Sequence, residues 1–379
     1  MADARYQIET DSLGRVKVPA GALYSAQTQR AVENFRSSGL KMPTRFIKAV
    51  TLIKKAAAEV NRELGLINGT VGYAISAAAD EILAGKHLKQ FPVDVFQTGS
   101  GTSTNMNVNE VLAALACQRC DGVDPNDQVN MGQSSNDVIP TAIHLSAAIA
   151  IDQELLPAMN HLAEVIDDKA RDVDDICKTG RTHLMDAMPI RLSQEMRGWS
   201  AQIRNGVDRI QCTRTRLHKI SQGATAVGTG INTPPEFAGK MAERLSEYTG
   251  LKFTPNPSPI TIAGQSGNFQ LNIMLPVIAF NLLQSIDLLS ITSRQLADKA
   301  ISGFRVNEDK LKKSLLNNPV LITVLSPHVG YRKVAEIVQR ASKERRPVIE
   351  VAEEETQFTR SELEEMLDPI KATQGGIRN

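Results

Sequence analysis

Three short polar segments contain most of the side chains that could bind or protonate a small ligand. They are residues 99–110, 133–137 and 180–186. In the first segment, two glycines let the backbone approach a ligand closely, and Ser, Thr and Asn side chains follow them. If a helix begins near Thr104, its free N–H groups would favour an anion. An ordinary Gly-Ser turn before an Asn-rich cap is the alternative. We expect the three segments to form one site for a small anionic substrate.

The second segment has more capping residues than a helix needs. Ser134, Ser135 and Asn136 stand where a long helical pattern begins. A single Ser or Asn is sufficient to cap a helix N-terminus. The run therefore indicates ligand binding in addition to capping.

The third segment contains His183, and histidine can donate or accept a proton near neutral pH. A lone histidine is more often structural. Its neighbour Thr182 and the two anion-binding segments favour a chemical role for His183. His144 and His328 have no such surroundings, so we expect them to be structural.

Two other motifs have weaker interpretations. Residues 223–233 form a Gly/Thr-rich loop, but they lack the Gly-Lys-Ser/Thr ending of a P-loop and no strand precedes them, so we do not expect a mononucleotide site. Cys117 and Cys120 form a lone C-x-x-C motif. Reduced thiols on or beside a helix are favoured over a zinc or redox pair.

Length and composition favour several helical domains. The 379 residues exceed the usual size of one domain, and the chain is 42% hydrophobic but only 4% aromatic, which suits packed helices. A net charge of +1 gives no reason to expect nucleic acid or an acidic membrane as partner. The polar N-terminus has no signal peptide pattern and no run of 18 apolar residues occurs, so we expect a soluble, cytoplasmic protein.

Apolar periodicity predicts long helices that would pack in a bundle. Residues 1–40 resemble an irregular or short-stranded arm, and short amphipathic helices follow residue 301. We expect Pro189 to open one long helix and Pro276 to kink another. The predicted long or medium helices span 45–64, 71–88, 141–173, 189–221, 234–248 and 269–301.

Several motifs in the same order resemble the class II fumarases of the aspartase/fumarase superfamily. His183 is the discriminating position, because aspartate ammonia-lyases usually carry Gln there. The resemblance covers nearly the whole chain. The motifs are Glu9-Thr-Asp-Ser-Leu-Gly, Ala26-Gln-Thr-Gln-Arg, Gly99-Ser-Gly-Thr, Asn105-Met-Asn-Val-Asn-Glu, Gln133-Ser-Ser-Asn-Asp, Gly180-Arg-Thr-His-Leu-Met-Asp-Ala, Gly228-Thr-Gly-Ile-Asn-Thr and Ala263-Gly-Gln-Ser-Gly-Asn-Phe.

The resemblance implies a mainly α, aspartase/fumarase-like fold, with a long-helix central bundle between smaller N- and C-terminal domains. On this basis the expected domains are residues 1–138, 139–301 and 302–379. It also implies a homotetramer in which each site is shared among three subunits. No metal or cofactor is expected.

The implied activity is the reversible hydration of fumarate to (S)-malate by general acid/base anti addition–elimination. The resemblance implies that His183 acts as the general acid/base and transfers protons through a water molecule. Aspartate ammonia-lyase or another superfamily lyase is the alternative, since residues 99–107 are shared with aspartases. By position, the residues expected to bind the substrate carboxylates are Ser100, Gly101, Thr102, Ser134, Ser135, Asn136 and Thr182.

Two positions depart from the family pattern. A second dicarboxylate site usually reads His-Pro-Asn-Asp, but this chain has Asp124, Pro125, Asn126 and Asp127, and an acidic first residue would repel a dicarboxylate. Near residues 254–260 the chain also lacks the family's Gly-Ser-Ser-x-x-Pro-x-Lys loop, which carries a serine base. Either intervening residues are missing from the sequence as printed, or the protein lacks them and is a catalytically impaired dicarboxylate-binding homologue.

Overall fold

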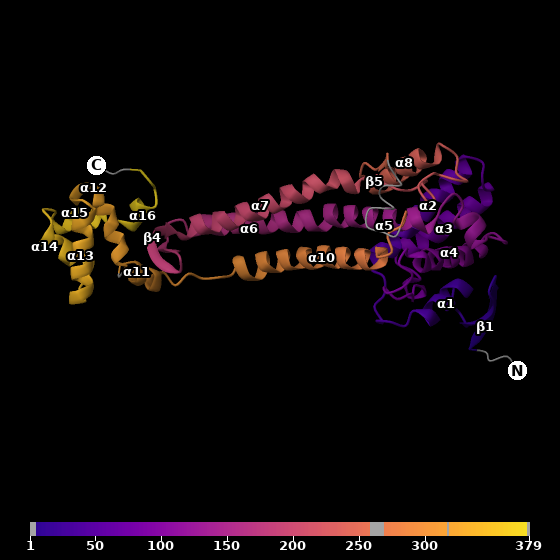
Figure 1. Ribbon diagram of the computed structural model, residues 1–379, viewed down its shortest axis with the longest axis horizontal. Helices are drawn as coiled ribbons and strands as arrows, with labels where there is room; N and C mark the ends of the chain where they lie inside the picture. Colours follow the sequence, from indigo (N-terminus) through magenta and orange to yellow (C-terminus); the bar gives the residue numbers. More distant parts are fainter. Residues whose placement is uncertain (1–4, 258–268, 317, 377–379) are drawn as a thin grey trace. The chain divides into compact units, whose positions relative to one another are not determined.

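The computed structural model describes residues 5–257, 269–316 and 318–376. Helices form most of this described part, which confirms the prediction of a mainly α fold (Figure 1). The chain divides into two compact units. The first unit comprises Met1–Leu156 and Ile210–Leu289, and the second comprises Pro157–Arg209 and Ser290–Asn379. The division at residues 138 and 301 stays a prediction.

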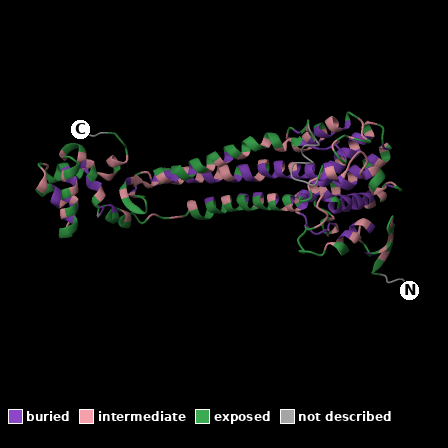
Figure 2. Cartoon of the chain, viewed as in Figure 1, coloured by how far each residue is buried: buried purple, intermediate pink, exposed green. Residues whose placement is uncertain are grey.

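The first unit is built around α2 (Thr44–Glu63), a helix predicted from its apolar periodicity. It packs against α3 (Gly69–Leu83), α4 (Thr102–Cys117), α5 (Ser135–Ala150) and α8 (Phe237–Thr249). These neighbours cover α2 on several sides, so it is buried along most of its length (Figure 2). Its buried apolar residues include Ile47, Val50, Ile53, Ala57 and Val60.

Short elements complete the first unit, and the N-terminal arm is short-stranded as predicted. The strands β1 and β2 form an antiparallel hairpin, whereas β5 and β6 pair in parallel. The bounds are β1 (Tyr6–Asp11), β2 (Gly14–Pro19), α1 (Ala26–Asn34), a 3-10 turn (Leu88–Gln90), two π-helical turns (Pro125–Val129 and Ile151–Leu155), β5 (Lys219–Ile220) and β6 (Thr254–Pro255).

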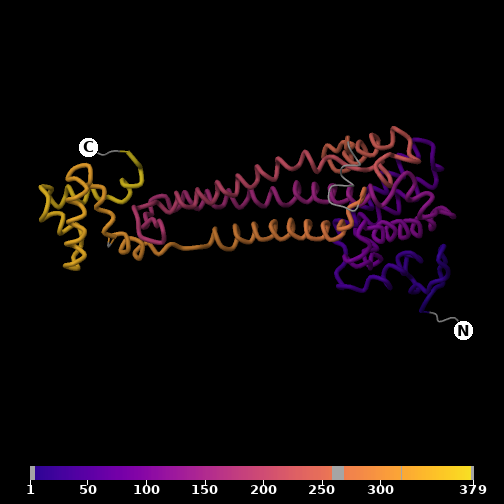
Figure 3. Tube along the Cα trace, in the orientation of Figure 1, coloured from indigo at the N-terminus to yellow at the C-terminus, as the bar shows by residue number. Residues whose placement is uncertain are grey.

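The second unit contains most of two long helices, α6 (Leu156–Asp172) and α7 (Leu192–Leu217), which lie side by side (Figure 3). The hairpin of β3 (Cys177–Thr182) and β4 (Met185–Arg191) connects them. The Ser200 hydroxyl of α7 donates to the Ala163 carbonyl of α6 over 3.4 Å. Apolar side chains of both helices then form one core, which contains Leu162, Ile166, Ala170, Val173, Ile176, Met196 and Ala297.

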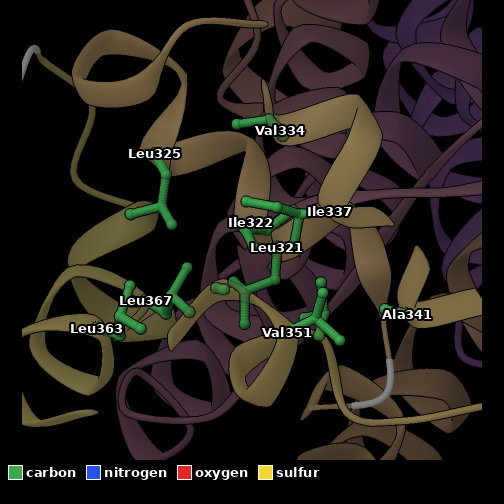
Figure 4. Packing of buried hydrophobic residues seen from close by; sticks show 11 residues of the cluster. Leu321, Ile322, Leu325, Val334, Ile337, Ala341, Val351, Leu363 and Leu367 are labelled. Atoms are coloured by element: carbon green, nitrogen blue, oxygen red, sulfur yellow. The ribbon is translucent and has the colours of Figure 1, made fainter. Parts of the chain in front are cut away.

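The C-terminal part of the second unit has its own apolar cluster. Short helices surround Leu321, Ile322, Ile337 and Val351, so each helix is held by packing rather than by its length (Figure 4). The helical bounds are a π-helical turn (Leu296–Ile301), α11 (Glu308–Leu316), a 3-10 helix (Pro319–Leu325), α12 (Ser326–Val329), α13 (Tyr331–Glu344), α14 (Val348–Glu355), α15 (Arg360–Met366) and α16 (Pro369–Ala372).

Two proline predictions were wrong. Pro189 does not open a helix: it lies in β4, opposite Thr179, and α7 begins three residues later. A two-stranded hairpin has only edge strands, where a missing N–H is tolerated. Pro276 does not interrupt a helix, because α10 (Leu275–Gln295) begins one residue before it. In the first turn the missing N–H has no helical partner to lose, so no kink is required.

Helix α10 has apolar side chains that are not covered within the described chain. Leu288, Leu289 and Ile291 are 58%, 54% and 54% exposed. Among the described residues, the stretch Leu275–Ile301 is long and apolar enough to cross a bilayer, and 33% of the 18-residue apolar window within it is buried. Core helices pass the same test of length and composition. These exposed apolar side chains therefore form a surface whose contact with water is unfavourable when the chain is alone.

A buried carboxylate fixes the start of α1. Glu110 of α4 is 4% exposed and accepts hydrogen bonds from the backbone N–H groups of Ser25, Gln27 and Thr28 at 2.9, 2.9 and 3.1 Å. The first N–H groups of a helix have no partner within the helix, and its N-terminus favours negative charge. Glu110 therefore links the N-terminal arm to the core.

We predict that Glu110→Ala lowers the free energy of unfolding by about 3 kcal/mol, because three buried N–H groups lose a charged acceptor. Urea unfolding followed by circular dichroism measures the change. The exposed Glu33 of α1 provides the control, and Glu33→Ala should change stability by less than about 0.5 kcal/mol. A loss below about 1 kcal/mol for Glu110→Ala would contradict this interpretation.

Candidate active site

Of residues 99–110, the first three form a loop that leads into α4, and residues 102–110 form the first half of that helix. The Gln97 side-chain oxygen accepts from the backbone N–H and the hydroxyl of Thr104, at 3.0 and 2.9 Å, and so fixes the first turn. The hydroxyls of Ser100 and Thr102 are 2.9 Å apart. Ser100, Gly101 and Thr102 therefore stand together at the N-terminus of α4. We call residues 99–102 the donor loop.

Only glycine fits at residue 99. The Gly99 carbonyl accepts a hydrogen bond from the backbone N–H of Leu275 over 3.0 Å. A Cβ atom on Gly99 would lie well inside van der Waals contact with the Ile273 carbonyl oxygen. The backbone that precedes α10 therefore crosses directly over the donor loop. Gly101 adopts a left-handed φ of 75°, which also favours glycine.

Residues 133–137 form the N-terminus of α5. Ser134 is the N-cap, and its hydroxyl accepts from the Asn136 N–H over 3.2 Å. In return, the Asp137 carboxylate accepts from the Ser134 N–H over 2.9 Å, which completes a capping box. Capping thus accounts for Ser134 and Asp137 but not for the side chains of Ser135 and Asn136.

One hydrogen bond joins the first two polar segments. The Asn105 side-chain amide donates to the Ser135 hydroxyl oxygen over 3.1 Å, and both residues are buried. Because the Ser135 oxygen accepts this bond, its own proton is available to donate elsewhere. The Asn105 side-chain oxygen is buried and has no hydrogen-bond partner in the described part of the chain. The structure therefore brings the donor sets of α4 and α5 together.

The Gly/Thr-rich residues 223–233 also pack against α5, which the sequence did not predict. Asp137 accepts from the backbone N–H groups of Gly223 and Thr225 at 3.1 and 2.8 Å, and the Asn136 amide donates to the Ala226 carbonyl over 2.8 Å. Burial raises the pKa of Asp137 to about 6, although these N–H groups oppose the shift. The only signal in the sequence was the excess of Gly and Thr between two helices.

A cavity of about 360 Å³ adjoins this loop, lined by residues that include Gln222, Gly230, Pro255 and Asn256. Gln222 is 1% exposed, and neither of its amide atoms has a partner in the part of the chain that the structure describes. Polar groups of this kind are usually satisfied by water or a ligand. The Gln222 amide therefore remains available for further hydrogen bonds beside residues 223–233.

Residues 180–186 belong to the second unit, whereas the other polar segments belong to the first. Thr182 pairs with Met185, so His183 and Leu184 form a two-residue hairpin turn. Their φ angles of 49° and 63° are both left-handed, as in a type I′ turn. Left-handed conformations are costly for residues other than glycine and cluster at functional sites. His183 is exposed at the tip, beside a Leu184 that is 96% exposed.

The candidate second dicarboxylate site, Asp124, Pro125, Asn126 and Asp127, has its own internal acceptor. The Asp124 carboxylate accepts from the N–H groups of Asn126 and Asp127 at 2.7 and 2.8 Å. A bound anion would need those same donors and would meet the negative charge of Asp124. The local geometry thus supports the expectation that an anion is disfavoured here.

Comparison with known proteins identifies the family. The sequence profile of a lyase family matches residues 14–282, and that of the fumarase C C-terminus matches residues 321–374. A class II fumarate hydratase of Pseudomonas aeruginosa is 44% identical over 100% of both chains, and one of Xylella fastidiosa is 43% identical over 98% of this chain and 96% of the relative. The chain belongs to the class II fumarase family of lyases.

Solved structures agree with this membership. A class II fumarase from Schistosoma mansoni has a TM-score of 0.92 at 29% identity and covers 98% of this chain and 99% of its own. A fumarate lyase:delta crystallin from Brucella melitensis has a TM-score of 0.91 at 30% identity, with 97% and 99% covered. These similarities confirm the predicted aspartase/fumarase-like fold.

The family comparison also bears on the loop that the sequence lacks. The alignment with the P. aeruginosa fumarase runs over 460 residues, whereas this chain has 379, so part of that relative has no counterpart here. The predicted departure covers residues 254–260, of which 258–260 lie outside the described residues.

We predict that Gly99→Ala lowers the free energy of unfolding by about 2 kcal/mol, because the new methyl group overlaps the Ile273 backbone. Gly69, the first residue of α3, is the matched control, since no atom lies within 4 Å of an added Cβ. Gly69→Ala should leave stability unchanged or raise it by about 0.5 kcal/mol. Equal urea midpoints for the two variants would show that the crossing at Gly99 is not tightly packed.

Proposed function

We propose that this class II fumarase catalyses the reversible hydration of fumarate to (S)-malate. The observation that carries the proposal is the Asn105–Ser135 hydrogen bond, which joins two sets of anion donors at helix N-termini. The curated relatives with 44% and 43% identity, both named class II fumarate hydratase, support it.

The donor residues suit the charge that develops in this reaction. In the dehydration direction, malate loses a proton from the carbon next to a carboxylate, and the electron pair moves into that carboxylate. The hydroxyl group of the neighbouring carbon then takes up a proton and leaves as water. Preorganised hydroxyl and amide donors stabilise such a dianionic intermediate. We assign this role to Ser100, Gly101, Thr102, Ser134, Ser135, Asn136 and Thr182.

His183 is assigned as the general acid/base that moves the proton, through a bound water. Its position on an exposed turn, in a different unit from the donors at the N-termini of α4 and α5, supports a site completed by another copy of the chain. The exposed apolar side chains of α10 supply a surface on which such copies would pack. We therefore propose a homotetramer with sites shared between subunits. A cytoplasmic location is part of the same proposal.

The first test is loss of the ultraviolet absorbance of fumarate on mixing with the protein. His183→Asn should lower kcat/KM by about a hundredfold or more, because proton transfer by a positioned side chain contributes at least that much. His161 of the same unit, whose ring is 2.6 Å from Asp298, gives the control. His161→Asn should keep wild-type rates. Release of ammonia from aspartate, or a wild-type protein that binds succinate without converting fumarate, would contradict the proposal.

Sharing of sites can be tested by mixing two inactive variants. His183→Asn and Ser135→Ala remove groups from different units of the chain. Unfolding the two together and refolding them should restore part of the wild-type activity, because some mixed sites would then contain both intact groups. Each variant refolded alone is the control. A mixture no more active than its parents would show that each site belongs to one chain.

A further inference from the structure

A buried lysine contacts the residues that support the donor side chains at the N-termini of α4 and α5. Lys54 stands on the inner face of α2, between Val50 and Ala57, and is 0% exposed. Its ammonium group donates to the side-chain oxygens of Asn130 and Gln133, at 2.7 and 3.1 Å. An ammonium group is rarely removed from water completely, because the loss of hydration must be offset by hydrogen bonds and charge.

The acceptors of Lys54 connect directly to the donor residues. The Asn130 oxygen that binds Lys54 also accepts from the Asn105 amide over 3.3 Å, and Asn105 in turn donates to Ser135. The Asn130 amide donates to the Gln133 carbonyl over 3.2 Å. Lys54 is thus the starting point of a chain of hydrogen bonds that reaches both α4 and α5.

The charge of Lys54 has limited compensation. Among the described residues, Asp137 is the charged side chain that acts on it, and the direct partners of its ammonium are neutral amides. Burial lowers the pKa of Lys54 to about 7, although the charge of Asp137 opposes this shift. A positive charge in a buried region acts over a longer distance than one in water. A role in packing alone would be met by an apolar side chain of similar length.

We propose that Lys54 is a positioning residue for the dicarboxylate site. It orients Asn130 and Asn105 so that the Ser135 hydroxyl points its proton toward the substrate, and it adds positive charge beneath the substrate carboxylate. This inference rests on the proposed function of residues 100–102 and 134–136. Lys54 itself does not touch the substrate.

The test compares Lys54→Met with Lys55→Met. Lys55 is the next residue of the same helix, but its ammonium pairs with Asp80 over 2.6 Å at the surface. Succinate, a dicarboxylate that cannot be hydrated, is titrated by calorimetry into each full-length protein. Lys54→Met should bind succinate at least tenfold more weakly and should raise the KM for fumarate more than it lowers kcat. Lys55→Met should match the wild type in both measurements.

The pH profile separates charge from packing. Succinate affinity of the wild type should fall as pH rises through about 7, because Lys54 loses its proton there. The charge of Lys54 lowers the pKa of Asp137, so the titration of Asp137 moves upward in Lys54→Met, and the total fall in affinity across the pH range is compared instead. This total fall should be smaller in Lys54→Met than in the wild type. A purely structural lysine would leave the total fall in affinity the same in the two proteins.

Amide hydrogen exchange gives a readout that does not depend on catalysis. Lys54→Met should speed exchange in residues 102–107 and 134–138 while leaving α3 unchanged. If Lys54→Met does not fold, Asn130→Ala breaks the same chain of hydrogen bonds and should have the same effect. Wild-type exchange in both segments together with wild-type succinate affinity would overturn the inference. A wild type that neither binds succinate nor converts fumarate would refute the proposed function, whereas the exchange comparison would still decide the role of Lys54.

Discussion

The buried carboxylate of Asp137 is the constraint on which the candidate site depends. A carboxylate removed from water must be supplied with donors, or it destabilises the fold by several kcal/mol. The donors here are the backbone N–H groups of Ser134, Gly223 and Thr225. Meeting this requirement fixes the first turn of α5 and holds a distant loop against it. The neighbouring side chains of Ser135 and Asn136 are then held in place as a consequence of the burial of Asp137.

Much of the fold could be predicted from periodicity, because burial imposes it. Helix α2 was predicted to within a residue at each end, since its apolar positions recur on one face. The start of α7 was predicted wrongly, because a proline is equally compatible with a first helical turn and with an edge strand. Pro189 lies in a hairpin strand and pairs with Thr179, which precedes it by ten positions in the sequence. Local sequence does not contain that information.

The polar residue types of the candidate site were recognisable, but their connections were not. Ser135 could be named from its place before a helix, whereas its bond to Asn105 depends on how α4 packs against α5. Lys54 and Lys55 are adjacent and chemically identical in the sequence. Only the packing of α2 shows that one is buried and the other pairs at the surface. Long-range contacts of this kind are set by tertiary structure.

The crossing of the backbone at Gly99 couples two parts of the molecule. The first residue of α10 is hydrogen-bonded to the donor loop, and no side chain separates them. A partner that packs on the apolar surface of α10 and shifts that helix must therefore shift the loop as well. Thermodynamic linkage makes the effect mutual: an anion that orders the loop strengthens the packing of α10 by the same free energy. Assembly and ligand affinity are then two measures of a single equilibrium.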